Sequence, residues 1–397
     1  MNKADLGDLR FAEGAHLLIK RALINLAYGE EILVRGSAPD LEVQLEAWAR
    51  AEGHELRVSR KPCGFKIRKG SAQSGRWKGA ERTGHADPHK LDGVVETAPR
   101  HWGLAARGAT VEAGAPEFNF QLVEKSQVWA EEAVRLYAQA VTAQWDPSTA
   151  IPWDTVFELQ HEVEDAVVQL MTYLIENEAA ALIVSSRFVA QLHPHFREVM
   201  QLLAIQAADE ARHVEVFTRR ALLKRDRPGL STVGGQLSLK TLVDEPDFAV
   251  ASFLLSVMGE GTFFVLLRFL ELHAPDPVTR AVTRLAANDE ARHVAFGVAH
   301  LRESINRDPS LLDRLAQSVH RRHETLRHTG GLNQEVLDAL ILLAAGGWDH
   351  NSLRQGSHRV MELIQDMDLG RRSQLARLGF EEGKAASLSG LHTRNFM

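Results

Sequence analysis

The hexapeptide DEARHV stands at Asp209–Val214 and again at Asp289–Val294. In each copy a glutamate and a histidine are three residues apart, so on a helix they project from the same face. Each copy lies within an apolar helical pattern, which places the pair on or beside a face that should be buried. An unpaired buried carboxylate and imidazole are costly, and a bound cation is the simplest compensation.

A further glutamate lies upstream of each copy, in the apolar stretches LIENEAAALIVSSRF and SVMGEGTFFVLLRF. Anchored on SRF and LRF, the two stretches place Glu178 at about the position of Glu260. The sequence therefore predicts an internal duplication, in which a helix with a glutamate precedes a helix with Glu-x-x-His. Glu176 is the alternative to Glu178; the two point about 200° apart around a helix, so only one can face the site. The alignment favours Glu178.

Four helices would then supply four carboxylates and two imidazoles, the ligand set of dinuclear sites in carboxylate-rich helical bundles. Oxygen-rich ligands with one imidazole per metal suit iron or manganese. Zinc sites usually contain fewer carboxylates. The predicted metal ligands are Glu178, Glu210, His213, Glu260, Glu290 and His293.

An aspartate lies four residues before each motif histidine, at Asp209 and Asp289. A carboxylate that accepts the second N–H of a metal-bound imidazole fixes the orientation of the ring. Arg212 and Arg292 would in turn neutralise the aspartates. The alternative is an exposed ion pair of little energetic value. Duplication in both halves favours the supporting role.

The composition is that of a globular protein of 397 residues, 45% hydrophobic and 25% charged, with a net charge of −6 that gives no reason to expect nucleic acid. A single cysteine excludes an internal disulfide framework and a multi-cysteine zinc site, so we expect a cytoplasmic protein. The N-terminus has no apolar leader. The most apolar stretch contains Glu260 and Arg268, which favours a buried helix over a membrane span.

The fold predicted from these patterns is mainly α, a helical bundle with extra helices preceded by a small α/β two-layer unit. We expect the α/β unit at residues 1–70, a polar, glycine-rich linker or extended arm at 71–117, and the helical domain at 118–397. The helices expected in the last of these are 155–191, 196–224, 246–272, 277–305, 309–327, 333–345 and 350–366.

The paired motifs and their upstream glutamates resemble the ferritin-like di-iron carboxylate superfamily. The closer branch is the ribonucleotide reductase small-subunit-like oxidases and oxygenases. The resemblance implies a ferritin-like four-helix bundle with two iron ions, or a Mn/Fe or manganese pair, and O₂ as co-substrate. It also implies that Asp209 bonds His293 and that Asp289 bonds His213.

Three subtypes of this superfamily carry marks that this sequence lacks. A radical tyrosine would follow the first motif histidine by four residues, where Phe217 stands; Gly297 is its equivalent in the second half. Hydrocarbon monooxygenases have a threonine where this chain has Phe264, with Thr262 two residues earlier. Arylamine N-oxygenases have an additional histidine where this chain has Ala286.

The N-terminal segment DLRFAEGAHLLIKRAL, with GEEILVRGSAPD and GHELRVSRKPCGFKIRKG, resembles the small TusA-like sulfur carriers. Phe11 stands where that family has its nucleophilic cysteine, which excludes persulfide chemistry there. Cys63 is expected in a Pro-Cys-Gly turn between two strands, with a structural role. The unit would serve docking or substrate presentation.

The function that this resemblance implies is an O₂-activating dinuclear-iron oxidase or oxygenase acting on a small organic or carrier-bound substrate, by hydroxylation, N-oxygenation or desaturation. The alternatives are a ferritin-like ferroxidase and a non-catalytic interaction module. No dinucleotide-binding fingerprint is visible, so an external reductase or ferredoxin would supply electrons. The helices after the second motif would cover the bundle or form a homodimer contact. The side chains expected to line the site, or simply to pack in the core, are Phe217, Phe263, Phe264 and Phe296.

Overall fold

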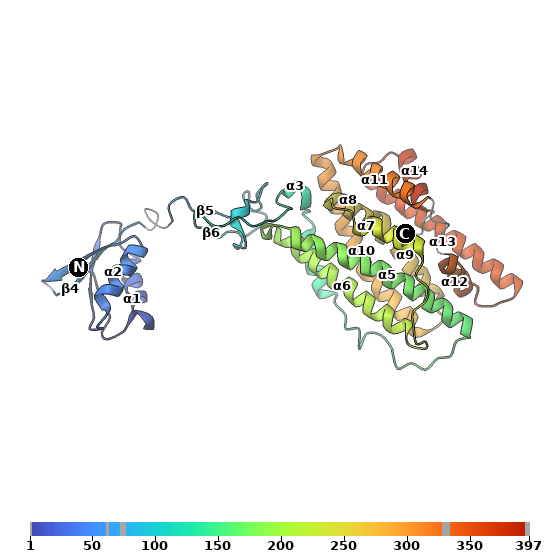
Figure 1. The fold of residues 1–397 in the computed structure, drawn as a ribbon, viewed down its shortest axis with the longest axis horizontal. Helices are drawn as coiled ribbons and strands as arrows, with labels where there is room; N and C mark the ends of the chain where they lie inside the picture. Colours follow the sequence, from blue (N-terminus) through green and yellow to red (C-terminus); the bar gives the residue numbers. More distant parts are fainter. Residues whose placement is uncertain (1, 61–62, 72–76, 328–333, 394–397) are drawn as a thin grey trace. The chain divides into compact units, whose positions relative to one another are not determined.

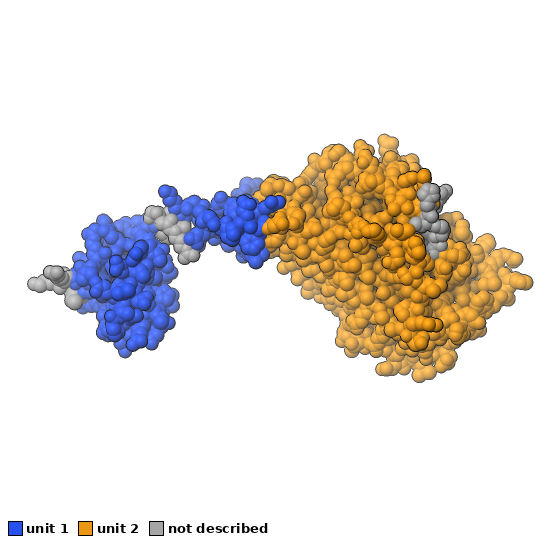
Figure 2. Space-filling model, in the orientation of Figure 1, with its two compact units in different colours: residues 1–94, 99–118 blue, residues 95–98, 119–397 orange. Residues whose placement is uncertain are grey.

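The computed structural model describes residues 2–60, 63–71, 77–327 and 334–393. The chain divides into two compact units, shown in different colours in Figure 2. The first comprises residues 1–94 and 99–118, and the second comprises 95–98 and 119–397. This division does not separate 71–117 from the N-terminal sheet, so the three-part domain division stays a prediction.

The first unit begins with a four-stranded sheet in the order β1-β2-β4-β3, on which two helices pack. Strand β1 runs parallel to β2, and the other neighbours are antiparallel. The face toward the helices is apolar because alternate strand residues point to it, including the fully buried Ile32, Val34 and Ile67. The elements are β1 (Asn2–Asp5), α1 (Ala15–Leu23), β2 (Glu31–Arg35), α2 (Leu41–Ala51), β3 (Glu55–Arg60) and β4 (Cys63–Arg68).

The predicted α/β character of this segment is confirmed, with two differences in detail. Strand β1 was not predicted, because its sequence NKAD has no β-forming residues and it is set by pairing with β2. Cys63 is the first residue of β4 rather than part of a turn, while Lys61 and Pro62 lie outside the described residues.

The rest of the first unit holds a short ladder of β5 (Glu81–Arg82) with β6 (Thr110–Val111), and the 3-10 helix η3 (Arg100–Trp102). Thr83 and Trp102 are buried here, so the segment expected to be an extended arm has local packing of its own.

The second unit is a bundle of four long helical segments (Figure 1). α5 packs along α6, α9 packs along α10, and α10 joins the two pairs by contacting α6. The predicted fold, a mainly α chain built on a four-helix bundle, is confirmed. The segments are α5 (His161–Gln191), α6 (Arg197–Ala221), the continuous run of α8 (Phe248–Ser252), π-helix η5 (Phe253–Glu260) and α9 (Gly261–His273), and α10 (Pro277–Arg307).

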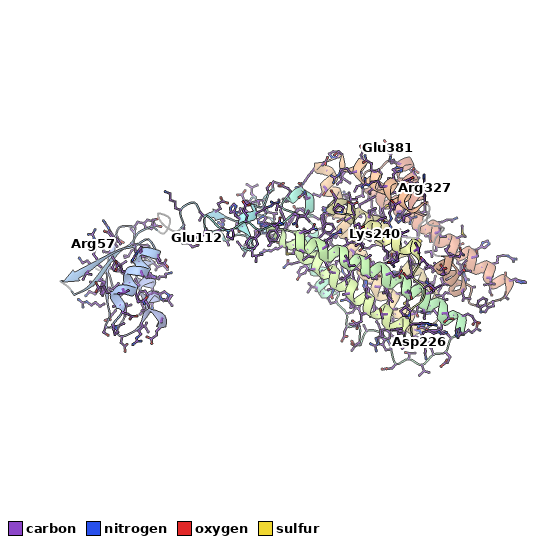
Figure 3. All side chains as sticks on the ribbon, in the orientation of Figure 1. Arg57, Glu112, Asp226, Lys240, Arg327 and Glu381 are labelled. Atoms are coloured by element: carbon purple, nitrogen blue, oxygen red, sulfur yellow. The ribbon has the colours of Figure 1, made fainter. Side chains whose placement is uncertain are left out.

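Among the described residues of this unit, seven further helices surround the bundle. α12 packs on α5 and α13, α13 packs on α9, and α14 packs on α13 and α11. Charged side chains such as Lys240 of α7 and Asp226 lie on the exposed surface (Figure 3). These helices are α3 (Lys125–Val128), α4 (Ala133–Thr142), α7 (Val233–Val243), α11 (Leu311–Leu326), α12 (Gln334–Ala345), α13 (His350–Arg377) and α14 (Glu382–Thr393).

Most predicted helices are confirmed within a few residues, but two boundaries are wrong and two helices were not predicted. α5 begins at His161 rather than near 155, where Glu162 and Glu164 in its first turn complement the helix dipole. α13 continues to Arg377, past the predicted end at 366. α7 and α14 were not predicted.

In the part of the chain that the structure describes, two helices are long and apolar enough to cross a membrane by length and composition, His161–Gln191 and Phe248–His273. In their most apolar windows, 61% and 83% of the residues are buried inside the structure. Core helices pass the same test of composition. The stretch around Glu260 is thus a buried helix carrying a carboxylate, as the sequence indicated.

Candidate metal centre

Each of the four bundle segments carries part of one buried cluster. Because residues three apart share a helix face, Glu210 and His213 project together from α6, as the second motif does from α10. The upstream glutamates come from the middle of α5 and from the last position of η5. All six predicted ligands are buried: Glu178, Glu210, His213, Glu260, Glu290 and His293.

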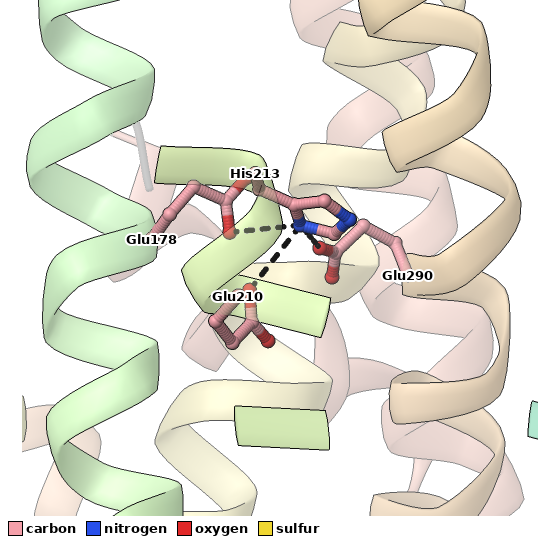
Figure 4. A group of neighbouring side chains, drawn as sticks. All are labelled: Glu178, Glu210, His213 and Glu290. Carbon is pink, nitrogen blue, oxygen red and sulfur yellow. Dashed lines mark ion pairs between the residues drawn. The ribbon is translucent and has the colours of Figure 1, made fainter. Parts of the chain in front are cut away.

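The first group gathers around His213, whose Nδ1 atom faces three carboxylates (Figure 4). That nitrogen lies 3.5 Å from Glu178 Oε2, 3.4 Å from Glu210 Oε2 and 3.5 Å from Glu290 Oε1. One potential ligand atom from each of the four residues lies within 4.8 Å of the others. A cation between them would take an imidazole and carboxylates from three helices.

The second group repeats this arrangement around His293. Its Nδ1 atom lies 3.1 Å from Glu210 Oε1, 3.9 Å from Glu260 Oε1 and 3.5 Å from Glu290 Oε2. Glu210 and Glu290 therefore belong to both groups, each with one oxygen toward either histidine. Two carboxylates belong to both groups, and each group has one further carboxylate of its own. This geometry is best explained by a site for two metal ions.

Glu178, and not Glu176, belongs to this cluster. Glu178 is buried, whereas Glu176 is only half-buried and is part of neither group. In the other half the glutamate closes a π-helix, a rare form of helix that is often found at functional sites.

Most of the donor atoms fit a bound metal pair because they have no hydrogen-bond partner among the described residues. Eight buried oxygen and nitrogen atoms of the six residues make no hydrogen bond to any part of the chain that the structure describes. Both oxygens of Glu210 and of Glu290 are among them, as is the Nδ1 atom of each histidine. Buried polar atoms are almost always satisfied in folded proteins, so this concentration points to a cation.

Electrostatics inside the cluster indicate the same need for positive charge. Burial, together with the charges of Glu210 and Glu290, raises the pKa of Glu178 well above its usual value. Burial and the charge of Glu290 likewise raise the pKa of Glu260. Burial also acts to raise the pKa of Glu210, but the two histidines outweigh it and hold that pKa well below its usual range. Protons or metal ions must therefore offset the crowded carboxylates.

The opposite edge of each imidazole meets an aspartate from the other half. His213 Nε2 lies 3.1 Å from Asp289 Oδ2, and His293 Nε2 lies 3.3 Å from Asp209 Oδ2. A hydrogen bond at Nε2 leaves Nδ1 free as a donor to a metal. The structure thus brings together the cross-pairs that the resemblance implied.

Two arginines link these aspartates. Arg212 contacts Asp209 and, at 3.0 Å, Asp289, while Arg292 contacts Asp289 and, at 3.3 Å, Asp209. The four charges form a closed ring between α6 and α10. Burial opposes ionisation of both aspartates, but their bonds to the histidines hold the pKa of each below its usual value; for Asp289 the bond to Arg292 adds to this.

Three polar residues around the cluster were not predicted. Gln144 donates to Asp209 at 2.8 Å, and the indole N–H of Trp145 donates to Asp289 at 2.8 Å. Gln206 donates to Glu260 Oε1 at 3.0 Å. The first two follow α4 and are far from the motifs in sequence. Gln206 lies one helical turn before Glu210, so its position on the same face of α6 could have been predicted from the sequence.

Of the four phenylalanines expected to line the site or to pack in the core, only some are buried near the cluster. Phe217 is fully buried, its ring 6.3 Å from that of His213, and Phe263 packs near Tyr173 at 5.8 Å. Phe296 is buried beside His300, whereas Phe264 is half-buried.

The packing around Gly297 explains why a glycine stands at this position. A Cβ at this position would lie 2.3 Å from the Cβ of Ser256 in η5. Glycine therefore permits the close approach of α10 to the π-helix that carries Glu260.

Comparison with known proteins identifies no family: no family model matches the chain, and no curated protein matches it. Among solved structures, a Synechococcus protein with aldehyde deformylating oxidase activity is 19% identical, covering 58% of this chain and 96% of that one, with a TM-score of 0.41. An R2-like ligand-binding oxidase with an aerobically reconstituted metal cofactor is 19% identical, covering 64% and 94%, with a TM-score of 0.44. At these TM-scores the likenesses carry no argument about this chain's chemistry.

Proposed function

We propose that this chain is an O₂-activating oxidase or oxygenase with a non-haem dinuclear metal centre, of iron or of manganese and iron. The observation that supports the proposal best is the sharing of Glu210 and Glu290 between two histidine-centred groups. A structural zinc site would need fewer carboxylates and no second, linked group. Hydroxylation, N-oxygenation and desaturation of a small organic or carrier-bound substrate all lie within the proposal.

The chain's own residues would hold and tune such a pair. His213 and His293 present Nδ1, while Asp289 and Asp209 fix the orientation of the rings from the far side. The bound metals would supply the redox chemistry toward O₂. Because the pKa values of Glu178 and Glu260 are raised, their carboxylates would hold protons that metal binding displaces.

The buried setting would exclude water from the centre. Phe217 covers the side of His213, and Gly297 lets α10 close against η5. Dry surroundings strengthen every electrostatic interaction inside a site and suppress side reactions.

Electrons would come from a separate reductase or ferredoxin, since the sequence shows no nucleotide-binding fingerprint. The N-terminal segment, residues 1–70, would have a TusA-like role in docking or substrate presentation and would not take part in the chemistry. A homodimer and a cytoplasmic location remain predictions.

A ferroxidase is the second candidate, because the same ligands could oxidise Fe(II) without an organic substrate. Anaerobic loading with Fe(II), followed by removal of unbound metal, should leave about two ions per chain. A single-turnover O₂ pulse should then give transient absorption and an oxidised product from a metabolite extract. Rapid Fe(III) release with no organic product would favour the ferroxidase, and failure to retain metal would contradict both.

A further inference from the structure

Glu260 is placed differently from its counterpart in the first half. It closes the π-helix η5, whereas Glu178 lies in the middle of the regular helix α5. Its Oε1 atom lies 3.9 Å from His293 Nδ1, the longest of the six distances between a carboxylate and an Nδ1 atom in the cluster. A π-helix is rare and is usually limited to a single turn. The position of Glu260 should therefore depend on contacts from outside its own helix.

Thr262 forms a hydrogen bond that spans the position of Glu260. Its hydroxyl donates to the carbonyl oxygen of Met258 at 3.0 Å, so the bond joins the second residue before Glu260 to the second residue after it. A threonine bond to a carbonyl four residues earlier often bends a helix. The equivalent position in the first half is Ala180, two residues after Glu178, which has no hydroxyl group.

Arg371 of α13 holds the hydroxyl of Thr262 in place. Because Thr262 gives its one hydroxyl proton to Met258, it can accept from Arg371, whose Nη1 atom lies 3.0 Å away. The Nε atom of the same guanidinium donates to Ser389 of α14 at 3.1 Å. Thr262, Arg371 and Ser389 are all buried. Burial lowers the pKa of Arg371 to about 10, which still leaves it charged at neutral pH.

The hydrogen bonds continue beyond Ser389. This hydroxyl donates to Asp368 Oδ1 at 2.6 Å, and Arg372 contacts the other oxygen of Asp368 at 2.7 Å. A continuous series of hydrogen bonds thus links α14 to η5 through the Arg371 side chain. Because buried polar groups are costly when left unbonded, such a series holds each of its members in place.

We propose that Arg371 is a positioning residue for Glu260. Through Thr262 it holds the end of η5 in the orientation that places Glu260 opposite His293. Through Ser389, α14 holds Arg371 in turn. The inference rests on the proposed metal centre and deepens it, because it makes one of the two metal ions depend on the C-terminal helices. The ion of the first group should be independent of them.

Anaerobic calorimetric titration of the metal-free full chain with Fe(II) measures the affinity for each ion. Thr262→Val keeps the size of the side chain and removes the hydroxyl, and should lower the affinity for one ion about tenfold. Thr262→Ser, which keeps the hydroxyl, should restore it. Ser389→Ala should lower the same affinity by a smaller factor, because Arg371 keeps its bond to Thr262.

Thr283→Val is the matched control. Thr283 of α10 is also buried, and its hydroxyl donates to the carbonyl of Thr279, four residues earlier, at 2.9 Å. Its bonds among the described residues stay within its own helix. Both affinities should therefore be unchanged in this variant.

Two backgrounds identify the affected ion. Glu178→Ala should leave only the ion of the second group, and the addition of Thr262→Val should lower its affinity about tenfold. Glu260→Ala should leave only the ion of the first group, where Thr262→Val should have no effect. If Thr262 served stability alone, Thr262→Val would lower the unfolding midpoint of the metal-free protein without any difference between the two backgrounds.

The outcomes separate this inference from the proposed function. Unchanged affinities in Thr262→Val, an equal loss for both ions, or a loss that Thr262→Ser does not restore would overturn the inference and leave the oxidase standing. Two bound ions with the expected effect of Thr262→Val, but no reaction with O₂, would support the inference and contradict the oxidase. A chain that binds no Fe(II) before any substitution would contradict the metal centre and therefore both.

Discussion

The two halves of the candidate metal centre carry the same types of residue and differ in what surrounds them. In both, a histidine turns Nδ1 inward and bonds through Nε2 to the aspartate of the other half. One turn before each motif glutamate the halves already diverge, with Gln206 in α6 and Ala286 in α10. The repeated residues are those whose geometry a metal pair would fix. Their neighbours were free to adapt to different packing.

The difference is largest two turns beyond the motifs. Seven residues after His213, α6 carries Arg220, buried and bonded to Glu164, Asp276 and Thr279. Those bonds outweigh burial and raise the pKa of Arg220, which keeps it charged.

At the corresponding position of α10 stands His300. It is fully buried, and its Nε2 atom has no partner among the described residues. Burial lowers the pKa of His300 to about 4, so it stays neutral. α6 thus carries a charged, ion-paired arginine at the position where α10 carries a neutral histidine, although both helices contain the same motif.

Removing a shared carboxylate should have the largest effect of all. Glu210→Ala should lower the retained metal from about two ions to about none per chain, because both groups lose a ligand. Glu178→Ala should leave about one ion, because only the first group is affected. Metal content after Fe(II) loading and desalting measures both. Equal losses in the two variants would contradict the distinction between shared and unshared carboxylates.

Breaking the buried charge cluster of α6 should cost about 3–5 kcal/mol of unfolding free energy, because Arg220→Met leaves two carboxylates buried without their cation. Denaturant unfolding of the metal-free protein measures the change. The control is Arg219→Met, at an exposed neighbour stacked 4.0 Å from the Trp153 ring, which should cost about 1 kcal/mol or less. A small effect at Arg220 would show that the cluster is not formed.

Acid should destabilise the protein through His300. Its pKa is about 4 in the folded chain and about 6.5 in the unfolded chain, so only the unfolded state takes up the proton between these values. Stability should therefore fall as the pH falls through this window, by about 3 kcal/mol in full. His300→Phe should flatten this part of the stability profile, whereas His350→Phe, at an exposed site, should not. Unchanged slopes in the first variant would disprove the assignment.

The smallest effect should come from making the halves more alike. Gln206→Ala removes the donor to Glu260 and copies the alanine of the second half, and should weaken binding of one metal ion about tenfold. Stepwise metal titration should show one affinity lowered and the other unchanged. A uniform loss at both steps would mean that Gln206 supports the bundle as a whole.

The sequence predicted the bundle and the six residues that cluster in it for one reason: the motif is duplicated at helical spacing, so each half supports the interpretation of the other. The unrepeated residues were missed. Gln206 has no counterpart in α10, and Trp145 reaches Asp289 from a connecting segment far away in sequence. The end of α13 was missed because its polar stretch has little hydrophobic periodicity, yet it supplies Arg371, which bonds Thr262.

Local spacing by itself determined which residues share a helix face, because helix geometry fixes that relation without reference to the rest of the chain. The alignment favoured Glu178 over Glu176, and the resemblance implied that each histidine pairs with the aspartate of the opposite half. Only the tertiary structure shows that Glu178 joins the cluster and that these pairs meet across α6 and α10. Each of these depends on how helices rotate and approach one another. That is settled by packing between segments distant in sequence, such as the contact that Gly297 allows between α10 and η5.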